Sequence, residues 1–99
     1  MSIVTTLQKT KLSVYYAYAP KLTKPPYLIY MGDGQETFDA DNTHYHRENA
    51  YRVEYYYKEK SESNEAAIED ILLADGFIYS KSEDIYIEDE GVFVIYYYL

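Results

Sequence analysis

The sequence predicts an α+β fold, a mostly antiparallel β-sheet with one main α-helix packed across one face. Short runs rich in tyrosine and β-branched residues alternate in side-chain character, which is typical of strands. Only residues 63–77, "SNEAAIEDILLADGF", have the apolar spacing of an amphipathic helix. A chain of 99 residues has room for one core, so we expect a single domain over residues 1–99.

The first half of the chain predicts two strands and a loop. Residues 12–18, "LSVYYAY", alternate as a strand does, and Pro20 ends them. Residues 27–31 predict a short strand at a sheet edge, because the two prolines before it have no amide donor. The polar residues 35–46 predict a loop that is a candidate for contacts with a partner.

Residues 45–58 predict the longest strand. Tyr51, Val53, Tyr55 and Tyr57 would share one face, and the residues between them the other. Such alternation predicts a sheet with two distinct faces. The residues expected on the second face are Arg52, Glu54, Tyr56 and Lys58.

The helix is expected to begin at Ser63 or Asn64 as N-cap and to end just before Gly76. Its expected apolar stripe is Ala67, Ile68, Ile71, Leu72 and Ala74, and its expected water-facing residues are Glu65, Glu69 and Asp70. The remaining residues predict one strand, with a possible break at residues 80–82, a turn at Glu90 and Gly91, and a final strand. The chain would therefore end in a β-hairpin.

Charge and composition exclude several classes of protein. Nine Lys and Arg against 17 Asp and Glu give a net charge of −8, which repels nucleic acid. The absence of cysteine excludes disulfides and thiolate metal sites. The N-terminus lacks the apolar core of a signal peptide, and no apolar stretch is long enough to span a bilayer, so we expect a soluble cytosolic chain with no membrane partner.

No motif for catalysis or for a cofactor is present. His44 and His46 would point to the same side of a strand, but two ligands without a third make a weak metal site. The acidic residues 83–90 lack the order of a calcium-binding loop, and no glycine-rich phosphate loop or nucleophile motif occurs. We therefore expect no enzyme activity, no metal and no cofactor.

The 15 tyrosines suggest a protein contact. A tyrosine on an open sheet face offers an apolar ring and a hydroxyl, the chemistry enriched at interfaces. The alternative is that tyrosine is used for its high β-propensity. The candidate interface residues are Phe38, Asp41, Asn42, Tyr55, Tyr56, Tyr57, Tyr96, Tyr97 and Tyr98.

Ordered blocks over nearly the whole chain resemble tail terminators, the small head-tail joining proteins of long-tailed phages and prophages of Gram-positive bacteria. The blocks are "VYYAYAP", "PPYLIYMGDGQETFDADNTHYH", "YRVEYYYKEK" and "IEDILLADGFIYSKSEDIYIEDEGVFVIYYYL". The resemblance implies a virion structural protein that forms a hexameric ring, caps the tail tube and docks the head. It implies contacts with itself, the tail tube protein and a head-closure protein, in the host cytoplasm and then at the head-tail junction, with DNA passing through the ring.

A second hypothesis comes from the charge alone. A small acidic protein encoded by a phage can inhibit a host nucleic-acid-binding protein by presenting carboxylates to it. Binding of that kind would weaken steeply with salt, because it is electrostatic.

Overall fold

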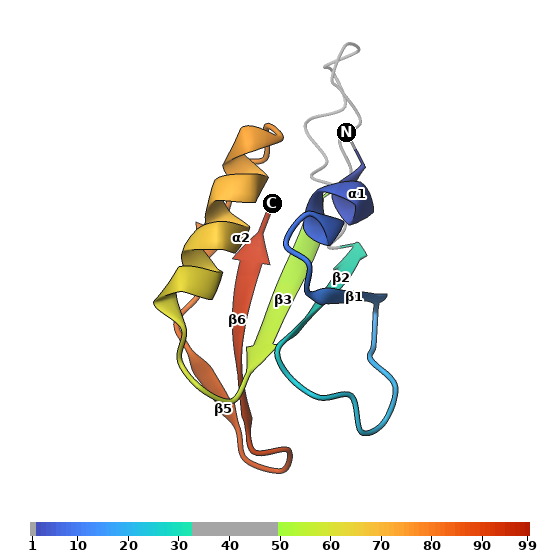
Figure 1. Cartoon of the computed structure of the whole chain (residues 1–99), viewed down its shortest axis with the longest axis vertical. Coiled ribbons are helices and arrows are strands. Elements are labelled where there is room, and N and C mark those ends of the chain that lie inside the picture. The colour runs from blue at the N-terminus through green and yellow to red at the C-terminus, as the bar shows by residue number, and fades with distance from the viewer. Residues whose placement is uncertain (1, 33–49) are drawn as a thin grey trace, which may run out of the picture.

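One β-sheet runs through the molecule, and both helices lie on the same face of it (Figure 1). The computed structural model describes residues 2–32 and 50–99. Each helix contributes two residues to the core that also contains the central strands: Ile3 and Leu7 from the first, Ile68 and Leu72 from the second. No helix of the described residues lies on the opposite face of the sheet, and we call it the helix-free face.

The described elements follow in the order α1 (Ile3–Gln8), β1 (Ser13–Tyr16), β2 (Tyr27–Gly32), β3 (Tyr51–Tyr57), α2 (Glu62–Ala74), β4 (Ser80–Lys81), β5 (Ile85–Ile87) and β6 (Val92–Tyr98). The strands lie side by side as β1-β2-β3-β6-β4, and β5 also pairs with β6. All pairs are antiparallel except β1 with β2. The predicted α+β fold, a mostly antiparallel sheet with one main helix, is confirmed.

The register of the central strands explains which tyrosines are buried. Tyr55 lies opposite Leu28 of β2 and Ile95 of β6, and all three point toward the helices. Because side chains alternate along a strand, Val53 and Tyr57 share this face and are also buried. The predicted alternation of residues 51–57 is therefore confirmed.

The prediction that residues 27–31 form an edge strand is wrong. Strand β2 lies between β1 and β3, and β1 takes the edge position. Pro25 and Pro26 do not interrupt pairing, because they precede Tyr27, where the ladder begins. The parallel pairing of β1 with β2 requires the connection at residues 17–26 to return to the starting end of β1.

Helix α2 is capped two residues before the earlier of its two predicted N-caps, Ser63 and Asn64. Its N-cap is Ser61, whose Oγ accepts a hydrogen bond of 3.2 Å from the Asn64 amide. It ends as predicted before Gly76, which has a φ of +89°. Ile68 and Leu72 are buried as predicted, whereas Ala67 and Ala74 are exposed.

Glu65 does not face water, contrary to the prediction. It lies one turn before Ile68 on the buried side of α2 and is only 4% exposed. Its carboxylate is held by Lys60 Nζ at 2.8 Å and Lys81 Nζ at 3.0 Å. A buried charge is tolerated there because both oxygens have a cationic partner.

The predicted C-terminal hairpin is confirmed. The single strand predicted before the last turn is two strands, β4 and β5. Strands β5 and β6 are joined by a turn in which Gly91 has a φ of +66°. The break falls after Lys81: Ser82 Oγ accepts a hydrogen bond from the Tyr96 amide, and its own amide donates to the Tyr96 carbonyl. Strands β4 and β5 therefore both pair with β6, at different positions along it.

Candidate interaction surface on the helix-free face

The helix-free face has a buried carboxylate near its centre. Glu54 of β3 is 6% exposed and accepts a hydrogen bond of 2.7 Å from the Tyr56 hydroxyl and one of 2.9 Å from Arg52 Nε. The Arg52 guanidinium also lies 5.4 Å from the centre of the Tyr96 ring. Burial and the hydrogen bond to Glu54 raise the pKa of Tyr56 well above its usual value, so this hydroxyl stays protonated and donates.

Aromatic rings from neighbouring strands cover the face around this carboxylate. The Tyr27 and Tyr56 rings stack with their centres 4.9 Å apart, because the two residues lie opposite each other in β2 and β3. Tyr15 of β1 meets the Tyr27 ring edge-on at 6.0 Å. On β6, the Tyr96 and Tyr98 rings lie 6.1 Å apart. The face is thus a tyrosine surface held by a polar network beneath it.

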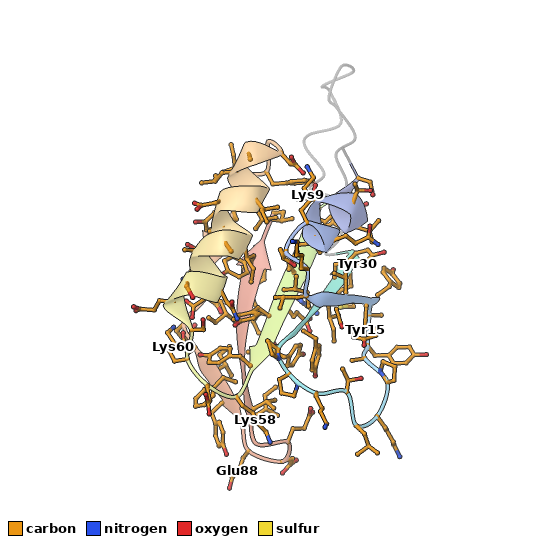
Figure 2. The ribbon with its side chains drawn as sticks, viewed as in Figure 1. Lys9, Tyr15, Tyr30, Lys58, Lys60 and Glu88 are labelled. Atoms are coloured by element: carbon orange, nitrogen blue, oxygen red, sulfur yellow. The ribbon has the colours of Figure 1, made fainter. Side chains whose placement is uncertain are left out.

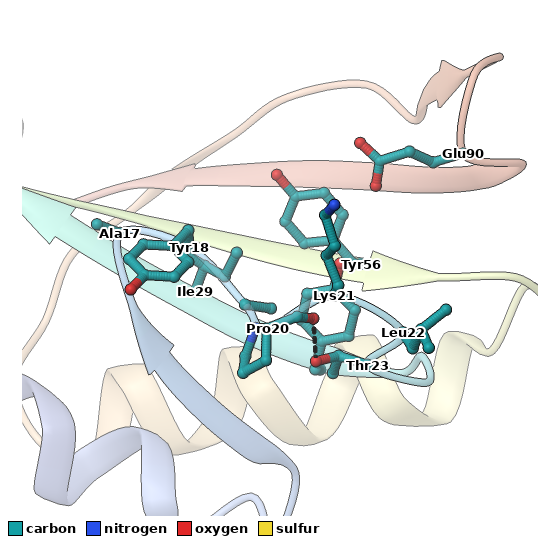
Figure 3. Close-up of a pocket in the computed structure, with 11 residues that line it drawn as sticks. Ala17, Tyr18, Pro20, Lys21, Leu22, Thr23, Ile29, Tyr56 and Glu90 are labelled. Carbon is teal, nitrogen blue, oxygen red and sulfur yellow. Dashed lines mark hydrogen bonds between the residues drawn. The ribbon is translucent and has the colours of Figure 1, made fainter.

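A pocket of about 470 Å³ lies where residues 17–23 arch over this face (Figure 3). Its floor is formed by residues of β2 and β3, and Glu90 from the turn between β5 and β6 lies at its rim. Two residues of the arch have left-handed backbone, Ala17 with φ 69° and Leu22 with φ 68°. The pocket is lined by Ala17, Tyr18, Ala19, Pro20, Lys21, Leu22, Thr23, Tyr27, Ile29, Tyr56 and Glu90.

The tyrosines proposed for an interface divide between the two faces. Tyr55, Tyr57 and Tyr97 are buried in the core beneath the helices, so their side chains are not available to a partner. Tyr56 and Tyr96 are half-buried on the helix-free face, and Tyr98 is 41% exposed there. The three other candidates, Phe38, Asp41 and Asn42, lie outside the described residues, as do His44 and His46.

Several exposed apolar residues were missed by the sequence analysis. Leu22 and Tyr18, both in the arch, are exposed, Leu22 at 97%. Tyr16 on β1 and Tyr86 on β5 are exposed at opposite edges of the sheet. The only signal in the sequence for Leu22 was its place as an apolar residue in the proline-flanked polar stretch "PKLTKPP".

A separate cluster of charged side chains joins α2 to the sheet edge formed by β4 and β5. Lys81 of β4 lies 2.7 Å from Glu69, and Lys60 contacts Asp84 at 2.9 Å (Figure 2 labels Lys60). The Tyr57 hydroxyl donates a hydrogen bond to the same Asp84 carboxylate. These carboxylates are neutralised by fixed partners, so the cluster fastens elements together and leaves no acid-base pair open to a substrate.

Residues 2–32 and 50–99 hold no group of three or more His, Asp or Glu side chains that could bind a metal ion. In this described part of the chain, no helix is long and apolar enough to cross a membrane. Comparisons with protein-family models, with curated proteins and with solved structures find no match to this chain.

Proposed function

We propose that the chain is a structural virion protein of a long-tailed phage, a tail terminator that caps the tail tube and provides the head-tail joining surface as a ring. The observation that carries the proposal is that the sheet has two different edges. Strand β1 forms one edge, and β4 with β5 forms the other. A ring is built from head-to-tail contacts, in which each subunit uses two different surfaces.

The two edges offer suitable groups for such contacts. An edge strand presents unpaired backbone donors and acceptors, which pair readily with another chain. Tyr16 on β1 and Tyr86 on β5 add an exposed ring at each edge. The helix-free face, with Tyr98 exposed, would then remain for the tail tube protein or the head-closure protein.

The charge of the chain is compatible with a ring through which DNA passes. The net charge is −8, and a basic lumen would retain the DNA. We propose no enzymatic role, since the buried carboxylates of the described residues, Glu54 and Glu65, are both paired with cations.

The proposal is tested by deleting the gene from an inducible phage that carries it and imaging the lysate by negative-stain electron microscopy. We expect overlong or ragged tails separate from filled heads, and rescue by the wild-type gene. Normal infectious particles, or mature particles that contain none of the protein, would contradict the proposal. They would favour the acidic host-directed inhibitor, which should bind a basic host protein with a steep dependence on salt.

Complementation with variants tests the two edges separately. Tyr16→Ala and Tyr86→Ala should each fail to rescue tail joining while the purified variant keeps its fold by circular dichroism. Lys58→Ala is the control, because Lys58 is exposed at the end of β3 and lies at neither edge. Equal rescue by all three variants would show that the edges are not used for assembly.

A further inference from the structure

We propose that the pocket under residues 17–23 binds the side chain of a lysine or arginine presented by a partner protein. The cationic group would lie near Glu90, and its aliphatic stem would pack on the half-buried Tyr56 ring. This inference goes beyond the proposed function and does not depend on it, because it concerns only the chemistry of one pocket on the helix-free face.

The shape of the pocket suits one long side chain. Its volume of about 470 Å³ falls at the small end of the range for ligand pockets, roughly 300–1,000 Å³. Pro20, Leu22 and Ile29 are among the lining residues and offer apolar surface against which the stem of a lysine or arginine can pack. Among the described residues that line the pocket only Lys21 is basic, so a small anion would find no cluster of cations there.

The charge of the pocket favours a cation. Glu90 lies at its rim and forms no ion pair with another described residue, so its carboxylate is available. The buried carboxylate of Glu54 lies behind the Tyr56 hydroxyl that lines the floor. Burial, then Glu90, then Glu54 raise the pKa of Tyr27, which places both negative charges close to the stacked rings.

The half-buried Tyr56 ring that lines the pocket adds a second preference for a cation. A lysine ammonium or an arginine guanidinium is attracted to the electron-rich face of an aromatic ring, by about 0.5–1 kcal/mol at an exposed site. The planar guanidinium stacks on such rings better than the ammonium does. Arginine should therefore bind more tightly than lysine.

Lys21 is the one basic residue among the described residues that line the pocket, and its own ammonium would compete with an incoming cation. Its side chain extends from the arch in the direction of Tyr56 and Glu90 (Figure 3). Within the described ranges its amine forms no ion pair, so a partner's cation does not have to break one. Removal of this charge should make the pocket more attractive to an incoming cation.

The test is a titration of the ¹⁵N-labelled full chain with N-acetyl-arginine amide, followed by NMR. We expect saturable shifts of the Ile29, Tyr56 and Glu90 amides. Glu90→Gln should weaken binding by roughly two- to fivefold, the effect of one exposed ion pair, and Lys21→Gln should strengthen it. Glu88→Gln is the matched control, since it removes the same charge from the same turn but does not line the pocket (Figure 2).

Three outcomes would overturn the proposal. The first is the absence of saturable shifts at these amides. The second is an equal effect of the Glu88 and Glu90 substitutions, which would show only the general attraction of an acidic protein for a cation. The third is equal binding of neutral N-acetyl-norleucine amide, which would show an apolar pocket with no preference for charge. If Glu90→Gln proved unfolded, the sign of the Lys21→Gln effect would still decide.

Discussion

The hydroxyl of Tyr97, in the last strand, donates a hydrogen bond of 2.8 Å to the carboxylate of Glu69 on α2. Tyr97 is fully buried, and the Glu69 oxygen that accepts this hydrogen bond also lies 2.7 Å from Lys81 Nζ. Burial and this hydrogen bond raise the pKa of Tyr97 well above its usual value. The contact therefore fastens the main helix to the sheet through a neutral phenol and an ionised carboxylate.

Tyr97→Phe removes this hydrogen bond and leaves the ring in place. We expect the free energy of unfolding to fall by about 1–2 kcal/mol, less than for a fully buried charged pair because Glu69 keeps Lys81 as a partner. Urea denaturation followed by circular dichroism measures the change. Tyr98→Phe is the control, because Tyr98 is exposed, and it should stay within about 0.5 kcal/mol of wild type. Equal losses in the two variants would contradict the assigned role.

The raised tyrosine pKa values predict a loss of stability in alkali. Burial is the first cause for Tyr56, Tyr57 and Tyr97, and a hydrogen bond to a carboxylate is the second. Above a pH of about 10 the unfolded chain ionises these phenols while the folded chain keeps their protons. The folded state then binds more protons, so the free energy of unfolding falls as the pH rises.

This alkaline loss is measured by urea denaturation at a series of pH values from about 8 to 11. Stability should be nearly constant at the lower end and should decrease from about pH 10 upward. Absorbance at 295 nm gives an independent reading, since the three phenols should ionise only when the chain unfolds. Titration of every tyrosine in the folded chain near pH 10 would contradict the assignment.

At acidic pH the free energy of unfolding depends on pH with the opposite sign, so stability falls as the pH decreases. The hydrogen bond from Tyr57 and the nearby Lys60 ammonium lower the pKa of Asp84. The Lys9 ammonium, then the Thr6 hydroxyl, lower the pKa of Asp75. An unfolded aspartate takes up its proton near pH 4 while these two stay ionised in the folded chain, so stability is present above that pH and is lost as the pH falls below it.

Asp84→Asn should flatten the dependence of stability on pH in acid, because it removes one of three described carboxylates whose pKa is lowered, the others being Glu69 and Asp75. Thermal unfolding between about pH 2 and pH 5 measures the slope. Asp89→Asn is the matched control, since Asp89 lies exposed in the turn between β5 and β6. A profile changed equally by both substitutions would show that overall charge, and not the Tyr57–Asp84 contact, sets the acid limit.

Local patterns in the sequence were sufficient for much of the fold. The alternation of residues 51–57 gave the two faces of β3, and Gly76 and Gly91 marked the end of α2 and the last turn. The parallel pairing of β1 with β2 was not predictable in this way, because it depends on contacts between distant segments. The prediction that Glu65 faces water failed for a related reason. Its lysine partners come from outside the helix, and Lys81 lies 16 residues away.

The candidate surface was predicted in part. Alternation separates Tyr55 from Tyr56 but does not tell which face the helices cover, so core and surface tyrosines were grouped together. The pocket was not predictable, since it exists only where residues 17–23 fold back over β2 and β3. No local pattern places Glu90 beside Tyr56, because their meeting depends on the order of the strands.

Two adjacent leucines of α2 give a direct test of the helix-sheet packing. Leu72 is fully buried in the core, whereas Leu73 is 54% exposed on the other side of the helix. Leu72→Ala should lower the free energy of unfolding by about 2–5 kcal/mol, through lost burial and the cavity that remains. Leu73→Ala makes the same chemical change and should stay within about 0.5 kcal/mol of wild type. Urea denaturation distinguishes the two, and a similar loss in both would mean that α2 does not pack on the sheet through the face that bears Leu72.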